Sequence, residues 1–170
     1  SPPRRMPAVG DQLFVHSCDF ATDALWVTDG TVTGTHAVAE VTGNGRCNGN
    51  FTPLVTDGLG VFSVLDAGMV WTNGTTLEPV PTVSAPELLT SGDGGIWFSS
   101  QASLWHAWRR DAGAFELTSL GQTPVAELIE WRAAAYFSDG LELHRTLPDA
   151  GLALLADIWP GAGASKPMDF

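Results

Sequence analysis

The chain has 170 residues, enough for one domain with a sizeable core. Its formal net charge is −11, with 19 acidic residues against eight Lys and Arg, so a phosphate-binding surface for nucleic acid is not expected. No run of about 18 apolar residues is present, which excludes a membrane-spanning helix. Hydrophobic residues make up 44% of the chain, and 19 Gly, 11 Pro and seven Trp favour a packed protein of turns and strands.

A proline recurs along the chain at similar spacing, at Pro3, Pro53, Pro86, Pro124 and Pro167. The steps between these prolines are 50, 33, 38 and 43 residues. Each interval contains four short apolar runs bounded by Gly, Pro, Asn or Asp, which is the signature of β-strands. The sequence therefore predicts an internal repeat of about 40 residues with four strands in each unit.

The runs follow one another in the same order in every unit. In chain order they are "MPAVGD", "QLFVHS", "ALWVTDG" and "THAVAEV"; "LVTDGLG", "GVFSVL", "MVWTNG" and "TLEPVP"; "LLTSGDGG", "GIWFSS", "HAWRRDAG" and "AFELTSL"; "ELIEWR", "AAYFSD", "ELHRTLPDAG" and "LALLADI". The stretch "PVAELIEWRAAAYF" has helical propensity, but its place in the repeat predicts two strands. Four strands per unit of this length is the period of a propeller blade.

We therefore expect an all-β fold, a β-propeller of four blades, each with four short antiparallel strands. The expected single domain spans 1–170, and its blades cover 3–52, 53–85, 86–123 and 124–166, with 167–170 starting a fifth unit. Because a fifth unit begins, we expect the chain to be a portion of a larger propeller. Another protein chain or further blades would then complete the ring and cover the terminal sheets.

Local signals refine this picture. "Asp29-Gly30" and "Asn73-Gly74" predict hairpin turns of type I′, in which both central residues have φ above zero. The equivalent positions Trp26, Trp71, Trp108 and His144 are expected to fill the core between blades. Trp105 and Trp131 lie outside this register and are expected at the surface.

The segment "ALWVTDGTVTGTHAVAEV" resembles the bacterial ELWxxDGT repeat, with matches at Leu25, Trp26, Asp29, Gly30, Thr31, Gly34 and Thr35. "LADIWPGAGASKP" resembles the segment after the fourth strand in the same family, with matches at Asp157, Ile158, Pro160, Gly161, Ser165 and Pro167. That family consists of exported or surface proteins, frequent in myxobacteria, with propeller-like repeats. The resemblance implies a secreted or cell-surface bacterial protein.

The two cysteines, Cys18 and Cys47, are predicted to form a disulfide. Cys18 falls in a loop between second and third strands, and Cys47 falls in the connection from the first unit to the second. Both loops belong to the same propeller face. Two free thiols in a cytosolic protein are the alternative, and a zinc site is disfavoured because no His lies near either Cys at a usual spacing.

The same face carries the longest loops and is the expected ligand face. The predicted ligand-face residues are Asp19, Asp23, Arg46, Asn48 and Trp159. Their polar and aromatic side chains suit a protein ligand or a glycan. The alternative is that these loops are ordinary solvated connections.

No pattern of catalytic or metal-binding residues stands out. The four histidines occur singly, and no carboxylate pair has the spacing of a calcium loop. We expect no cofactor, no metal and no catalytic residue. The leading hypothesis is a non-enzymatic binding or scaffold module; a lectin-like glycan-binding module and a propeller hydrolase or lyase are the alternatives.

Overall fold

The computed structural model describes residues 6–18, 22–42, 54–65, 68–81, 86–87, 89–92, 94–109, 114–132, 134–147 and 151–156. These residues form sixteen β-strands and no helix, and the strands pair into four antiparallel sheets of four. The predicted all-β class and its pattern of four strands in each of four sheets are therefore confirmed. A propeller, which is one way to arrange such sheets, stays a prediction. Among the described residues, no helix is long and apolar enough to cross a membrane.

Each sheet is a simple meander, because strands that follow one another in the sequence are paired in space. The chain divides into two compact units, unit 1 at Ser1–Ala85 and unit 2 at Pro86–Phe170, with two sheets in each. One sheet falls within each of the four predicted repeat units, whereas the boundaries between those units stay predictions.

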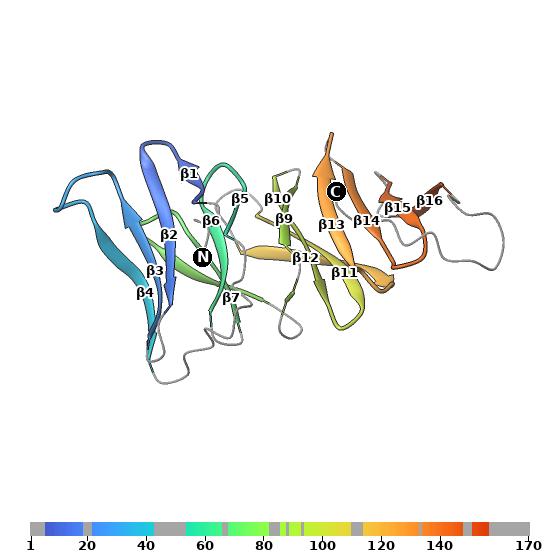
Figure 1. The fold of residues 1–170 in the computed structure, drawn as a ribbon, viewed down its shortest axis with the longest axis horizontal. Helices are drawn as coiled ribbons and strands as arrows, with labels where there is room; N and C mark the ends of the chain where they lie inside the picture. Colours follow the sequence, from blue (N-terminus) through green and yellow to red (C-terminus); the bar gives the residue numbers. More distant parts are fainter. Residues whose placement is uncertain are drawn as a thin grey trace. The chain divides into compact units, whose positions relative to one another are not determined.

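Unit 1 contains sheets A and B. Sheet A is formed by β1 (Ala8–Val9), β2 (Gln12–Cys18), β3 (Thr22–Thr28) and β4 (His36–Thr42), and sheet B by β5 (Val55–Thr56), β6 (Val61–Leu65), β7 (Gly68–Thr72) and β8 (Leu77–Val80) (Figure 1). Phe14 in β2 lies opposite Val27 in β3, so both side chains point to one face of sheet A. There they form a core cluster with Leu25, Leu54 and Val61. Burying each of these large side chains contributes about 1.5–3 kcal/mol.

Unit 2 contains sheets C and D. Sheet C is formed by β9 (Leu89–Gly92), β10 (Gly95–Ser100), β11 (Ser103–Arg109) and β12 (Phe115–Gln122), and sheet D by β13 (Glu127–Trp131), β14 (Ala134–Ser138), β15 (Leu143–Thr146) and β16 (Leu152–Ala156) (Figure 1). Their shared core is the cluster Trp97, Leu104, Leu120, Ala135 and Phe137. The Glu130 N–H also donates to the Thr90 hydroxyl at 3.3 Å, which ties the first strands of the two sheets together.

The type I′ turn occurs at a place that the sequence did not indicate. Ser100 pairs with Ser103, and the two residues between them, Gln101 and Ala102, have φ of 51° and 53°. Both central positions of this two-residue turn are therefore left-handed, as type I′ requires. Neither residue is Gly, Asn or Asp, so pairing along β10 and β11 must hold the backbone in this conformation.

The prediction of type I′ turns at "Asp29-Gly30" and "Asn73-Gly74" is wrong. Only the glycine of each pair has positive φ, at 88° and 92°. The second hairpin is also longer than two residues, since Thr72 pairs with Leu77. The Asp and Asn side chains bond to the following backbone instead, as described below, and this favours a wider turn.

The tryptophans at the repeat positions do not share one environment. Trp71 is 2% exposed, as expected for a core residue, but Trp26 is 37% exposed. Trp26 lies opposite Val15, on the face of sheet A turned away from the unit 1 core, which explains the difference. Trp131 is 54% exposed, as predicted, whereas Trp105 is half-buried.

Candidate functional site

Four hairpins carry the same three-residue sequence, Ser or Thr followed by Asp or Asn and then Gly. They lie at 28–30, 56–58, 72–74 and 138–140, and we call them the braced turns. In each one the Gly N–H donates to the hydroxyl oxygen two residues earlier. These distances are 3.0 Å at Gly30, 2.9 Å at Gly58, 3.0 Å at Gly74 and 3.0 Å at Gly140.

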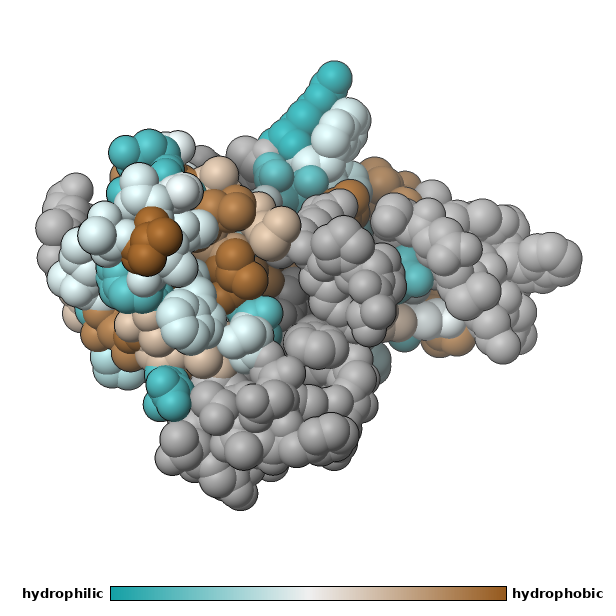
Figure 2. Space-filling view, turned by 60° about the vertical axis from the view of Figure 1, so that its left-hand side comes forward, coloured by the Kyte–Doolittle hydropathy of each residue, from teal (hydrophilic) through white to brown (hydrophobic). Residues whose placement is uncertain are grey.

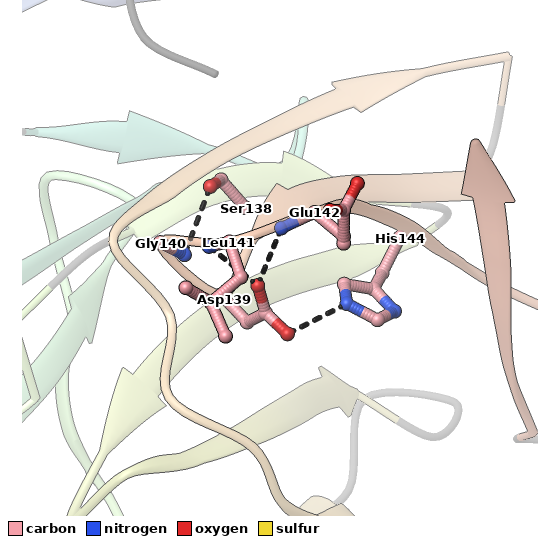
Figure 3. A network of polar contacts seen from close by, with 6 residues as sticks. All are labelled: Ser138, Asp139, Gly140, Leu141, Glu142 and His144. Carbon is pink, nitrogen blue, oxygen red and sulfur yellow. Dashed lines mark hydrogen bonds and ion pairs between the residues drawn. The ribbon is translucent and has the colours of Figure 1, made fainter. Parts of the chain in front are cut away.

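The Asp or Asn side chain closes each turn from the other side. In the turn at 138–140, Asp139 Oδ1 accepts hydrogen bonds from the N–H groups of Leu141 and Glu142, both at 2.8 Å (Figure 3). Asp57 and Asn73 make the same pair of bonds to residues two and three positions later, at 2.9 and 2.8 Å and at 3.0 and 2.9 Å. Such local bonds explain why Asp and Asn are favoured in turns.

The turn at 28–30 is extended by threonine hydroxyls. Thr31 donates to Asp29 Oδ1 through its N–H at 2.8 Å and through its hydroxyl at 2.7 Å. The Thr31 hydroxyl in turn accepts from the Gly34 N–H at 2.9 Å. A Cβ at Gly34 would overlap the Asp29 carboxylate. The segment "DGTVTG" therefore has a structural reason for its Asp, its first Thr and its second Gly.

Aromatic ring nitrogens engage the second carboxylate oxygen in two of the braced turns. Trp71 Nε1 donates to Asp57 Oδ2 at 3.1 Å. His144 Nε2 lies 2.8 Å from Asp139 Oδ2 (Figure 3). The His144 ring also stacks on Phe137, with centroids 5.2 Å apart. His144 occupies the Trp position of its repeat unit, and in sheet D it serves as a polar partner of a turn carboxylate, as Trp71 does in sheet B.

Two of the braced turns, those at Asp29 and Asp139, favour the ionised form of their carboxylate. Burial raises the pKa of Asp139, but the N–H groups of Glu142 and Leu141, together with His144, outweigh it and keep the pKa below 3.8. The pKa of Asp29 is also below 3.8, because the hydroxyl and N–H of Thr31 bond to its carboxylate. These acids therefore act as fixed acceptors within the turns.

Apolar side chains project from the tips of three braced turns. Leu59 is 70% exposed, Leu141 is 54% exposed, and Val32, one residue further along its loop, is 93% exposed. Single hydrophobic side chains among hydrophilic ones are also visible on the side of the molecule where sheet A lies (Figure 2). The turns therefore combine a rigid, internally satisfied backbone with an exposed apolar tip.

In unit 1 several turns meet at one end of the two sheets (Figure 1). His36 Nε2, at the start of β4, lies 3.3 Å from the Gly74 carbonyl oxygen in the β7–β8 turn. A Cβ at Gly74 would also lie 2.6 Å from Gln12 Oε1, at the start of β2. Three acidic residues, Asp11, Asp29 and Asp57, lie in the turns of unit 1.

The predicted site residues lie mostly beyond the described part of the chain. Asp19, Arg46, Cys47, Asn48 and Trp159 are outside it altogether. The prediction that Cys18 lies in the loop between the second and third strands is wrong, because strand pairing continues further: Cys18 is the last residue of β2 and its backbone pairs with Asp23 in β3. The side chains of both residues lie outside the described part. The Cys18–Cys47 disulfide and the long-loop ligand face therefore stay predictions.

The residues that brace the turns are only partly predictable from the sequence. "Asp29-Gly30" and "Asn73-Gly74" indicate turns, but the hydroxyl residue before each carries a signal that a search for Asp-Gly and Asn-Gly alone misses. The signal that identifies all four sites is the Ser or Thr before Asp-Gly or Asn-Gly. In the described ranges, no cluster of three or more His, Cys, Asp or Glu side chains is arranged to hold a metal ion.

Comparisons with protein families, with curated proteins and with solved structures find no match to this chain. The resemblance to the ELWxxDGT repeat therefore rests on the matching residues of the two segments alone and stays a prediction. Function is accordingly inferred from the geometry of the described residues.

Proposed function

We propose that this chain is a non-enzymatic binding or scaffold module of an exported bacterial protein, and that it binds a protein partner. The observation that supports this function most directly is the apolar tip of the braced turns. Leu59 and Leu141 occupy the same position, two residues after the Asp, and both are exposed. Exposed aliphatic side chains on rigid loops suit contact with another protein surface.

The bracing itself favours binding. Binding to a loop normally costs the conformational entropy that the loop loses, roughly 0.5–1.5 kcal/mol for each side chain that becomes ordered. In the turns around Asp57 and Asp139, side-chain oxygens already satisfy the turn N–H groups and order the backbone before a partner arrives. The contact then consists mainly of burying the apolar tip.

The polar groups of these turns have little capacity left for chemistry. Both carboxylate oxygens of Asp57 and of Asp139 accept hydrogen bonds from within the same sheet. Their arrangement supports a structural role for the acids and for His144. The proposal thus places partner binding on the braced turns, whereas the sequence-based hypothesis placed it on the long loops that carry Asp19, Arg46 and Asn48.

Site-specific photo-crosslinking in the source bacterium tests the proposal. A photoreactive amino acid at Leu59 or Leu141 should capture a defined partner, whereas the same group at Thr75, the polar residue at the corresponding tip, should capture it poorly. The purified partner should then bind the chain in a titration, and Leu59→Asp should weaken that binding about tenfold or more. Capture that does not depend on position, or turnover of a polysaccharide by the purified chain, would contradict the proposal.

A further inference from the structure

The braced turn at 72–74 contains an Asn-Gly dipeptide, a sequence in which asparagine converts readily to aspartate because glycine has no Cβ to hinder the approach of its nitrogen. In this reaction the backbone nitrogen of Gly74 attacks Cγ of Asn73, a new N–C bond forms, and the carboxamide nitrogen leaves as ammonia. Water then opens the five-membered imide at either carbonyl, which gives Asp or isoaspartate. Water is the only other reactant, so the contacts around the Gly74 nitrogen and Cγ of Asn73 control the rate.

The attacking nitrogen is held by a neighbouring hydroxyl. The Gly74 N–H donates to Thr72 Oγ1 at 3.0 Å, and Thr72 Oγ1 donates to the Thr76 carbonyl oxygen at 2.6 Å. Because the hydroxyl hydrogen is used in that second bond, a lone pair of the oxygen faces the Gly74 N–H. Thr72 is 0% exposed, and Gly74 is buried as well. The nitrogen must lose its proton before it attacks, and this buried bond opposes both the loss of the proton and the movement towards Cγ.

The carboxamide of Asn73 is fixed through its oxygen. Asn73 Oδ1 accepts from the N–H groups of Thr75 and Thr76 at 3.0 and 2.9 Å, and the hydroxyls of the same two residues lie 2.9 and 3.0 Å from it. These bonds hinder rotation of the carboxamide, but they also draw electrons from Cγ and make it easier to attack. The two effects oppose each other, whereas the bond on the Gly74 nitrogen acts only against the reaction.

The other three braced turns carry Asp in place of Asn73, with the same bond on the glycine nitrogen. An ionised carboxylate is a poor target for attack by nitrogen, and the pKa values of Asp29 and Asp139 lie below the ordinary 3.8. Asn73 has no ionised form and lacks this protection. The turn at 72–74 therefore depends more on its hydroxyl than the turns at Asp29 and Asp139 do.

We infer that Asn73 is a latent deamidation site, whose reaction the Thr72 hydroxyl restrains by holding the Gly74 nitrogen. Isoaspartate at this position would insert an extra carbon atom into the backbone next to Gly74. The Gly74 carbonyl oxygen lies 3.3 Å from His36 Nε2, at the start of β4, so the insertion would disturb this contact between sheets B and A. The hydroxyl residue of the motif thus protects unit 1 against chemical ageing. The inference is independent of partner binding at the turn tips.

Peptide mass spectrometry of the full chain, incubated in mildly alkaline buffer, measures the reaction at Asn73. In guanidinium chloride, Asn73 should deamidate at a rate similar to that of Asn44 and Asn48, which also precede glycine. In the folded wild type Asn73 should deamidate about tenfold or more slowly than in denaturant, because the turn must first open locally. An Asn73 that is slow in denaturant as well, or equally fast in the folded chain, would overturn the inference.

Three variants separate the effect of the hydroxyl from that of general destabilisation. Thr72→Val removes the hydroxyl with little change of shape and should accelerate deamidation of Asn73 several-fold in the folded protein. Thr72→Ser keeps a hydroxyl, as Ser138 does in its own turn, and should stay close to the wild-type rate. Val80→Ala is the matched control, because it removes a buried side chain from the other end of the same hairpin and leaves the Thr72 bond in place.

The Val80→Ala variant should deamidate at close to the wild-type rate, and denaturant unfolding checks that it is destabilised at least as much as Thr72→Val. Equal acceleration in these two variants would assign the slow rate to the stability of sheet B and overturn the inference, as would an unchanged rate in Thr72→Val. Hydrogen exchange at the Gly74 amide gives a test that needs no variant. This amide should exchange slowly in the wild type, and exchange as fast as in the unfolded chain would contradict a held nitrogen.

Discussion

The Asp139 carboxylate links the stability of the protein to pH. The pKa of Asp139 is lower in the folded protein than its ordinary value of 3.8. In the pH range between these two pKa values, the unfolded chain therefore binds more protons than the folded protein. The stabilisation is therefore complete above the ordinary pKa and is lost as pH falls through the lower, folded value. The same sign holds for Asp29.

The difference in unfolding free energy between wild type and Asp139→Asn should therefore become smaller as pH falls from about 5 to about 2. The wild type loses the contribution of its titrating carboxylate over this range, and the variant has no such carboxylate to lose. Urea unfolding midpoints measured across this range check the expectation. Leu141→Ala, which changes the turn tip and keeps the carboxylate, should run parallel to wild type. A gap between Asp139→Asn and wild type that widens towards low pH would contradict a lowered pKa for this carboxyl.

Gly60 shows how closely one turn packs against its neighbouring strand. A Cβ at this position would overlap the Trp71 indole, whereas a Cβ at Gly68 would meet nothing within 4 Å. Gly60→Ala should cost about 1–3 kcal/mol, since the ring or the turn must shift. Gly68→Ala should change stability by less than about 1 kcal/mol. Denaturant unfolding of the pair measures this difference, and equal effects would contradict the packing argument.

Among the elements, β15 is tied to the preceding turn by His144. His144→Phe keeps a ring on Phe137 but removes the bond to Asp139, and we expect a loss of about 1 kcal/mol. A double-mutant cycle with Asp139→Ala measures the coupling of the pair. His144→Trp, which restores the Trp of the repeat with its own N–H donor, should retain more stability than His144→Phe. Equal losses in the two variants would show that the hydrogen bond contributes nothing.

Element type was predictable from the sequence, and turn geometry was only partly so. The stretch "PVAELIEWRAAAYF" forms β13 and β14, as the repeat predicts, despite its helical propensity. Tertiary pairing overrides local preference here, and Arg132 adopts φ of 52° in the turn between the strands. The left-handed turn at Gln101 and Ala102 had no compositional signal. This turn follows from the register in which β10 and β11 pair, and that register cannot be predicted from the two turn residues alone.

At the scale of the whole molecule, net charge opposes compaction. The chain carries −11, and its eight basic residues leave most carboxylates without an opposite charge nearby in the sequence. Raising NaCl from about 10 mM to about 150 mM should increase the unfolding midpoint at neutral pH, because salt screens this repulsion. Thermal unfolding monitored by circular dichroism measures the shift. A midpoint that falls as salt is added would contradict it.

Whole-molecule organisation was predictable as far as the repeat reaches. Four units of four runs form four sheets of four strands, because each unit contains its complete set of strand and turn signals. The different exposure of Trp26 and Trp71 was not predictable, since it depends on which sheet face has a neighbour. The role of His144 was likewise not predictable, because it depends on how close Asp139 lies in the folded chain.

The braced turns also bear on how the chain folds. Nearly all of their hydrogen bonds join residues no more than five positions apart, as in the bonds around Asp57 and Asp139. Closing so short a loop takes roughly tens of nanoseconds, and a hairpin follows within about 1–10 microseconds. Each meander can thus nucleate from its own sequence before distant parts of the chain meet. A repeat built in this way can gain or lose a unit by gene duplication or deletion without disrupting the early folding of the others.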